Sequence, residues 1–246
     1  IKSALMTTTT SVKLPSGLVD PDRWGYGAGH MNPNGAAAPG LVYDLGPADH
    51  GRFLCGLGLV PPAGIGSCST LGSIKPSDLN LPSITVAAVI GPTTVSRKVT
   101  NVTAATNTYV ASTSLPGFSV TVSPPSLTLA PGQTGSFNVA MTPTTAVNGA
   151  WAFGTLAWSD GVASVVSPLS ARALGFTAPA VVSDVRASGT GTKVVPVISA
   201  YTGSLGVSAV GLVPATRSTS AIQTNAVQCF DTSVPAGAQL VRFQLF

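Results

Sequence analysis

Two histidines, His30 and His50, are the only side chains in this 246-residue sequence that titrate near neutral pH when unperturbed. A hydrolytic triad needs such a base beside a serine nucleophile and an orienting aspartate. His30 lies in a glycine-rich stretch, where a structural, hydrogen-bonded histidine is the simpler interpretation. His50 directly follows Asp49, and adjacent residues on a helix do not face one another. A small independent hydrolase would therefore require a serine or aspartate within hydrogen-bond reach of either histidine.

Metal-binding patterns are missing from the sequence. It contains no Cys-x-x-Cys pair, no histidine pair at helical spacing and no aspartate cluster of the EF-hand type. Asp20 and Asp22, beside Arg23, could form a calcium or salt-bridge corner, but a solvated loop is the simpler interpretation. We therefore predict no metal site and no cofactor.

The three cysteines are an odd number. Cys55 and Cys68 flank a short loop rich in glycine and proline, a workable span for a disulfide, whereas Cys229 has no obvious mate. We predict a Cys55–Cys68 disulfide, and three buried free thiols are the alternative.

Three tryptophans and one sequon are the other residues that could carry a function. In a β-sandwich, exposed tryptophans can form a platform for carbohydrate or protein, whereas buried ones belong to the core. Trp158 alternates with Leu156 and is predicted to be core, while the role of Trp151 stays open. Asn101-Val-Thr103 is a formal N-glycosylation sequon.

The composition favours β-structure. Only 8% of the residues are charged, all eight carboxylates are aspartates, and there are 27 glycines and 20 prolines, so long surface helices are not expected. The net charge of +4 comes from scattered Lys and Arg, without the basic stripe and interleaved aromatics of a nucleic-acid surface. No run of about 18 apolar residues is present, so no membrane span is predicted.

A period of two begins near Asp78 and indicates short strands. Turn signals separate the strands, among them Asp160-Gly161, a strong hairpin signal because both residue types tolerate positive φ. About seven strands at this spacing are typical of a β-sandwich of roughly a hundred residues. The alternating positions are Ile84, Val86 and Ala88; Val95, Arg97 and Val99; Phe118, Val120 and Val122; Leu127 and Leu129; Phe137, Val139 and Met141; and Leu156 and Trp158.

The flanking regions differ from this pattern. Before it, Asn32 followed by Pro33 predicts a helix N-cap and first turn. After it, three weaker strands are predicted at Val194–Ile198, Ala226–Asp231 and Val241–Phe246. The last leaves an apolar face without a cover, which suggests a β-domain that is only partly present.

The run from Gly25 to Leu45, with Ile1–Thr9 before it, resembles the end of the catalytic domain of subtilisin-like serine proteases (peptidase family S8), in the branch found in plants and many bacteria. Residues 73–173 resemble the fibronectin type III-like domain that follows it there. The segments that carry this second likeness are Asp78–Ser83, Val99–Val102, Ser123–Leu127 and Gly154–Gly161. In this family the nucleophilic serine precedes the segment that resembles Ile1–Thr9, so the resemblance implies that the chain holds no catalytic residue.

The expected organisation is mainly β. A mostly helical and loop remnant of an α/β subtilisin catalytic domain (residues 1–60) and a linker (61–77) precede the fibronectin type III-like β-sandwich (78–174), and a partial second β-domain (175–246) follows it. The resemblance implies a non-catalytic C-terminal segment of a secreted, extracellular endopeptidase. The parent would cleave protein or peptide substrates, and its upstream catalytic domain would be the partner of this segment. The alternative is a stand-alone extracellular β-sandwich module for adhesion, carbohydrate binding or protein binding.

Overall fold

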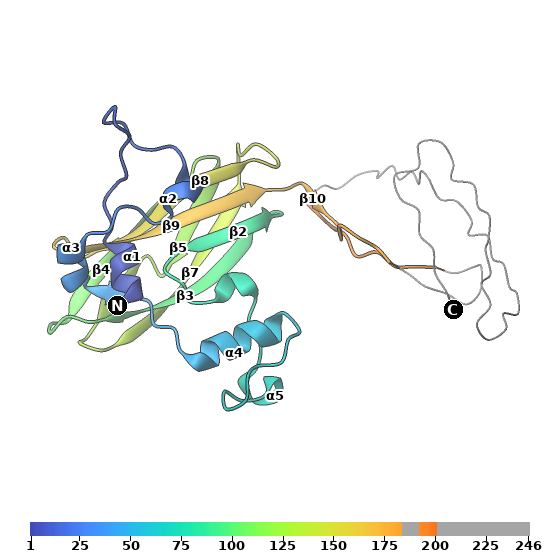
Figure 1. The fold of residues 1–246 in the computed structure, drawn as a ribbon, viewed down its shortest axis with the longest axis horizontal. Helices are drawn as coiled ribbons and strands as arrows, with labels where there is room; N and C mark the ends of the chain where they lie inside the picture. The colour runs from blue at the N-terminus through green and yellow to red at the C-terminus, as the bar shows by residue number, and fades with distance from the viewer. Residues whose placement is uncertain (184–191, 201–246) are drawn as a thin grey trace, which may run out of the picture. The chain divides into compact units, whose positions relative to one another are not determined.

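The computed structural model describes residues 1–183 and 192–200, and it is built around two β-sheets packed face to face (Figure 1). One sheet has the order β1-β3-β7-β5 and the other the order β2-β9-β8-β4-β6. The first comprises β1 (Leu41–Val42), β3 (Thr93–Asn101), β5 (Phe118–Ser123) and β7 (Thr134–Pro143). The second comprises β2 (Ile84–Val89), β4 (Asn107–Ser114), β6 (Ser126–Leu129), β8 (Trp151–Ser159) and β9 (Ser164–Ala173).

The predicted alternation produces most of the core between the sheets. In β2 it fails after Val86, where the register shifts, so that Ala88 is exposed and Val89 is buried. Trp158 is fully buried and its ring meets that of Phe137 edge to face, with centroids 5.0 Å apart. Such large side chains remove much apolar surface from water, which is the main favourable term in folding. Other fully or nearly fully buried members are Ile84, Val95, Val99, Tyr109, Val139, Met141, Leu156 and Leu169.

The Asp160-Gly161 turn joins β8 to β9. The two strands pair from Trp151↔Arg172 to Ser159↔Ser164, and Gly161 has a φ of 90°. One carboxylate oxygen of Asp160 accepts hydrogen bonds from the backbone N–H groups of Val162 (2.9 Å) and Ala163 (2.7 Å). The aspartate thus satisfies the turn's own donors, as aspartates in turns commonly do.

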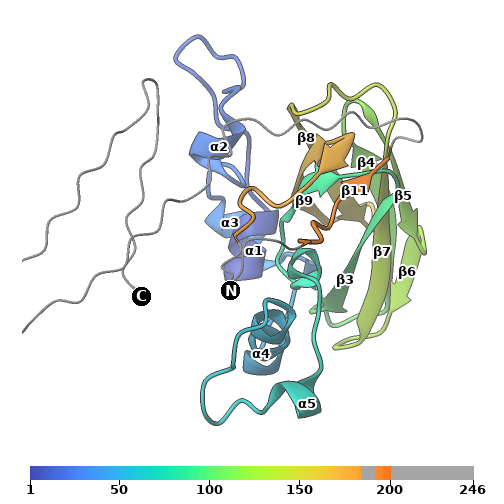
Figure 2. The same ribbon diagram turned by 90° about the vertical axis from the view of Figure 1, so that its right-hand side faces the viewer.

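Three short helices lie beside β9: α1 (Lys2–Thr7), α2 (Arg23–Tyr26) and α3 (Pro33–Ala37), as Figure 2 shows. Asn32 caps α3 as predicted, since its side chain accepts a hydrogen bond from Gly35 N. The chain then enters the sandwich, where β1 pairs with β3 and the side chains of Leu41 and Tyr43 join the core.

A small lobe follows β1 and contains α4 (Pro47–Gly56) and α5 (Cys68–Leu71). A 3-10 turn, η1 (Pro76–Asp78), leads from this lobe into β2. The helix α5 lies in the segment that the sequence predicts to be a linker. None of the helices in the described part of the chain has both the length and the apolar character needed to cross a bilayer.

Beyond β9, two residues of β10 (Phe176–Thr177) pair with two of β11 (Ile198–Ser199). The strand predicted at Val194–Ile198 is therefore regular only at its last residue, because Pro196 has no N–H to give to a ladder. The strands predicted at Ala226–Asp231 and Val241–Phe246 lie outside the described residues.

Candidate functional site

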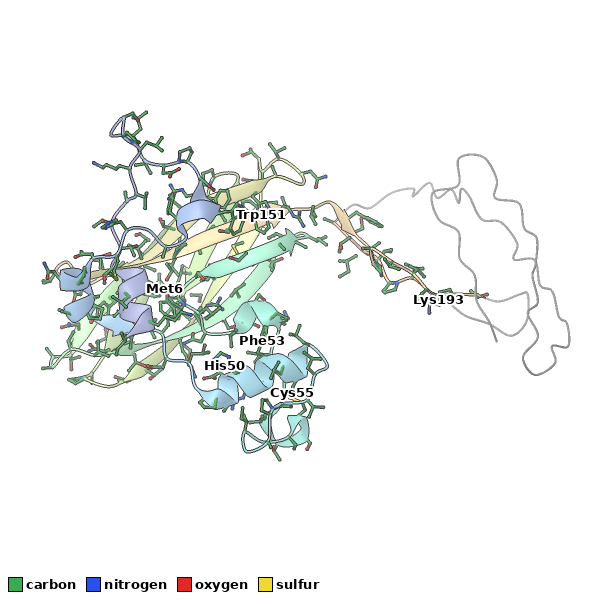
Figure 3. All side chains as sticks on the ribbon, viewed as in Figure 1. Met6, His50, Phe53, Cys55, Trp151 and Lys193 are labelled. Carbon is green, nitrogen blue, oxygen red and sulfur yellow. A yellow bond between two sulfur atoms is a disulfide. The ribbon has the colours of Figure 1, made fainter. Side chains whose placement is uncertain are left out.

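Among the residues that the structure describes, the two histidines have no catalytic partners. His30 exchanges backbone hydrogen bonds with Thr10, at 2.9 Å in both directions, and its side chain is exposed. His50 is exposed on α4 (Figure 3). Within residues 1–183 and 192–200, neither imidazole forms a hydrogen bond with a serine or aspartate. The condition set for an independent hydrolase is not met by these side chains.

Asp20 and Asp22 are used locally. Asp20 accepts a hydrogen bond from Asp22 N (2.8 Å), and Asp22 caps α2 by accepting one from Gly25 N (3.0 Å). No group of three or more His, Cys, Asp or Glu side chains suited to a metal ion occurs among the described residues.

Cys55 and Cys68 are joined by a disulfide, with a Cα–Cα distance of 5.5 Å. The bond ties the C-terminal end of α4 to the start of α5 (Figure 3 labels Cys55). Cys229 lies outside the described residues.

The lobe meets the sandwich through a charged contact. Asp49 on α4 lies 3.3 Å from an Arg52 nitrogen and 3.4 Å from Lys98 Nζ on β3. Partial burial raises the pKa of Asp49, but the backbone N–H of Gly46 and the two cations lower it more, so the net pKa falls below the usual value. Because these side chains are partly exposed, the contact orients the lobe more than it stabilises the fold.

Arg97 is the buried cation at the same junction. Its guanidinium donates to the carbonyl oxygens of Ser77 (2.6 Å), Ser96 (2.8 Å), Leu81 (3.1 Å) and Ser83 (3.2 Å). Burial lowers the pKa of Arg97, while the nearby Tyr43 and Asp78 raise it. The fixed fork of donors thus fastens residues 77–83 to β3.

Tyr43 links three parts of the chain. Its backbone N–H donates to Ser3 Oγ of α1 (2.8 Å), and its hydroxyl lies 2.8 Å from Ser167 Oγ of β9. Burial raises the pKa of Tyr43 to about 12, although Ser167 and Arg97 act to lower it. A phenol held neutral in this way serves as a structural hydrogen-bonding group.

Two surface hollows accompany these contacts. One, of about 540 Å³, lies between the lobe and the β3–β7 face and includes Asp49 and Lys98. The other, of about 840 Å³, includes Asn107 and Asp160, and the Asn107 amide donates to an Asp160 carboxylate oxygen at 3.1 Å. In both hollows the named charged groups already have protein partners.

An aromatic cluster lies on the outer side of β8. The Trp24 ring packs edge to face on Trp151 and Phe153, with centroids 5.0 and 5.2 Å away. The Arg172 guanidinium lies 5.3 Å from the centroid of Trp151. Trp24 itself is 56% exposed, so one tryptophan of the cluster is open to solvent.

Comparison with known proteins agrees with the sandwich. The family model described as "Fibronectin type-III domain" matches residues 78–171. Among solved structures, the FixG-related protein from Vibrio parahaemolyticus aligns with a TM-score of 0.30 and 14% identity, over 33% of this chain and 78% of that chain. This likeness is too low to bear on fold or function.

Three curated relatives that match the chain are subtilisin-like proteases. Subtilisin-like protease SBT2.5 of Arabidopsis thaliana is 36% identical over 63% of this chain and 21% of that protein. Subtilisin-like protease SBT3.3 of Arabidopsis thaliana is 39% identical, over 61% of this chain and 20% of that protein. Subtilisin-like protease Glyma18g48580 of Glycine max is 38% identical, over 70% of this chain and 24% of that protein.

These matches share two properties. The chain spans only about a fifth to a quarter of the length of each relative, and 61–70% of the chain takes part. That share is larger than the sandwich alone, so the flanking segments contribute to the likeness. The chain resembles the C-terminal portion of these subtilisin-like proteases, and its residues 78–171 match the fibronectin type-III domain.

Proposed function

We propose that this chain is a non-catalytic segment of a secreted subtilisin-like serine endopeptidase. The parent enzyme hydrolyses peptide bonds, and this segment supports its stability, assembly or substrate access. The proposal rests on one observation above all. Residues 41–43, within the stretch that resembles the end of a catalytic domain, are built into the sandwich core, where Leu41 is fully buried. Folding of the segment that resembles a catalytic domain and folding of the β-sandwich are therefore coupled.

The same proposal assigns a location and partners. The partners are the upstream catalytic domain and, through the parent enzyme, protein or peptide substrates. The location is extracellular, because the Cys55–Cys68 disulfide requires an oxidising compartment to persist.

Activity of the isolated chain tests the non-catalytic part. The purified chain is incubated with a generic unfolded protein substrate and with a serine-directed covalent inhibitor, followed by intact mass measurement. We expect no turnover and no adduct, while a subtilisin treated in parallel gives both. Inhibitor-sensitive turnover with a single adduct would overturn the proposal and identify the reacting serine.

The supporting role is tested in a longer protein that includes the upstream protease domain. Leu41→Ala removes a fully buried side chain from β1, whereas Leu18→Ala changes a residue that is 69% exposed. We expect Leu41→Ala to shorten the half-life of activity at elevated temperature without changing kcat/KM per active site. Equal half-lives for the two variants would contradict a supporting role.

A binding module is the second candidate function, and the aromatic cluster favours it. An exposed tryptophan backed by two aromatic rings can stack on a sugar or on an apolar side chain. Trp24→Ala should then abolish retention on a polysaccharide or peptide matrix, while Leu18→Ala should not. If the unchanged chain is not retained on any such matrix, the cluster only packs α2 against β8.

A further inference from the structure

Asn101 is the last residue of β3, and its side chain is completely enclosed. The residue has 0% of its surface exposed. Its Nδ2 donates hydrogen bonds to the carbonyl oxygens of Leu129 (2.8 Å) and Ala105 (2.9 Å). Its Oδ1 accepts bonds from Thr103 N (2.9 Å) and Thr103 Oγ1 (2.8 Å). Both donor hydrogens of the amide are therefore in use, and its oxygen accepts more than one hydrogen bond.

This amide also joins the two sheets. Leu129 ends β6, which belongs to the sheet opposite β3. The buried hydroxyl of Tyr109 donates to Asn101 Oδ1 at 3.3 Å, and Tyr109 is only 1% exposed. One side chain therefore holds together the end of β3, the end of β6 and the ring of a core tyrosine. A buried network of this kind is costly to leave partly unsatisfied.

Asn101-Val-Thr103 is also the only Asn-x-Ser/Thr sequon in the sequence. N-glycosylation forms a bond from Nδ2 to the anomeric carbon of a lipid-pyrophosphate-linked oligosaccharide. The bond from that carbon to the phosphate oxygen breaks, and Nδ2 loses a proton. The modified nitrogen keeps one hydrogen, so one of its two donated bonds is lost. The sugar would also have to occupy a site with no exposed surface.

We propose that sugar attachment at Asn101 and the native fold exclude one another. In a compartment with N-glycosylation, the sequon is a substrate only before the sandwich closes. Once the amide is bonded to Leu129 and Ala105, Nδ2 is out of reach of an enzyme. The competing reaction therefore marks chains that have not folded at this end of the sandwich.

A matched control is available in the same molecule. Asn148 and Ala150 are both exposed and lie in the turn before β8. Ala150→Thr creates an exposed sequon with Asn148 as its acceptor. This variant is produced in a eukaryotic secretory host, and occupancy at Asn148 and Asn101 is measured by peptide mass spectrometry in secreted and retained fractions.

We expect the secreted protein to carry sugar at Asn148 and none at Asn101, and any Asn101-linked sugar to be confined to the retained fraction. A peptide of residues 98–106 serves to show that the sequon itself is recognised. We expect a microsomal oligosaccharyltransferase to modify this peptide and to leave Asn101 of the native protein unmodified.

Two results would overturn the proposal. One is sugar at Asn101 in secreted protein whose thermal unfolding midpoint equals that of unmodified protein. The other is failure of the enzyme to modify the peptide, since the enzyme would then not recognise this sequon even in an unfolded chain.

Discussion

Three buried polar residues, Arg97, Asn80 and Tyr43, hold the preceding segments against the sandwich. The Asn80 side chain donates to the carbonyl oxygens of Asp44 (2.8 Å) and Lys98 (2.9 Å) and accepts from Lys98 N (2.8 Å). The Asn80 amide thus pairs with both the N–H and the carbonyl oxygen of Lys98 in β3, much as the backbone of a neighbouring strand would. The alternation of Val95, Arg97 and Val99 predicts that Arg97 points inward, but it does not predict the carbonyl groups that the guanidinium binds.

Arg97→Lys tests how much the guanidinium fork contributes. A lysine keeps the charge but cannot reach all four carbonyl groups, so some buried acceptors lose their donor. We expect the free energy of unfolding to fall by about 2–4 kcal/mol, measured by urea denaturation. Arg172→Lys is the control, because among the described residues that half-buried side chain donates a single hydrogen bond, to Ala87 O, and the change should cost under about 1 kcal/mol. Equal losses would mean that Arg97 acts only through its charge.

The alkaline stability of the protein should depend on Tyr43. Its folded pKa of about 12 lies above the ordinary tyrosine value of 10.0, so between these values the unfolded chain loses a proton that the folded chain keeps. The stability contribution of the neutral phenol is therefore complete below pH 10 and is lost as the pH rises toward 12. Two pKa units correspond to about 2–3 kcal/mol.

Comparison with Tyr43→Phe isolates this effect, because Arg97 and the other groups are common to both proteins. We expect the stability advantage of the unchanged protein to shrink between pH 9 and pH 12, measured by urea denaturation at each pH. The difference in tyrosinate absorbance between the two proteins should have its midpoint near pH 12. A midpoint near pH 10 would show that the phenol is in contact with water.

At the scale of elements, a glycine allows β4 and β8 to pass closely. A Cβ placed on Gly154 would collide with the backbone carbonyl oxygen of Ser114 at the end of β4. Gly149 is the matched control, since a Cβ there meets nothing within 4 Å although its φ is +80°. We expect Gly154→Ala to cost more than about 3 kcal/mol and Gly149→Ala about 1 kcal/mol in urea denaturation. A larger loss for Gly149→Ala than for Gly154→Ala would show that the positive φ, rather than close approach of the backbone, determines the cost of adding a Cβ.

The disulfide should stabilise the lobe but not the sandwich. It closes a loop with a sequence separation of 13, for which chain entropy predicts about 3 kcal/mol. The joint replacement of Cys55 and Cys68 by serine should therefore increase hydrogen exchange in α4 and α5. The buried strands β3 and β7 should exchange as before. If exchange rises equally in these strands, the lobe and the sandwich unfold as one unit.

Several elements were predictable and others were not, for identifiable reasons. Strands with alternating large apolar residues, such as β3 and β7, are evident in the sequence. The strand β4 is not, because Tyr109 is its only buried residue. In β9, Ser167 faces the core and Pro168 interrupts the pattern. The side chains that join elements, Asn101 and Asn80, are read as a sequon and as a family motif, since the contacts that cross between elements, from Asn101 to Leu129 and from Asn80 to Asp44, are distant in sequence.

At the scale of the whole molecule, the family match and the physical sandwich do not begin at the same residue. The fibronectin type-III match starts at residue 78, but β1 and the core residues Leu41 and Tyr43 come earlier. Burial of two such side chains contributes about 3–6 kcal/mol, which is a large share of the stability of a small domain. We propose that the residues between β1 and β2, which include the segment 61–77 predicted to be a linker, form an insertion within one folding unit.

Two shortened chains distinguish these views. A chain of residues 39–200 keeps β1, Leu41 and Tyr43, whereas a chain of residues 78–200 loses them together with the Asn80–Asp44 contact. We expect the longer chain to unfold cooperatively in urea and the shorter one to be less stable by at least about 3 kcal/mol, or not to fold. Adding Leu41→Ala and Tyr43→Ala to the longer chain should reproduce most of that loss. If residues 78–200 are as stable as residues 39–200, β1 contributes nothing to the stability of the sandwich. The proposed coupling between folding of the protease-like segment and folding of the fibronectin type-III domain would then be wrong.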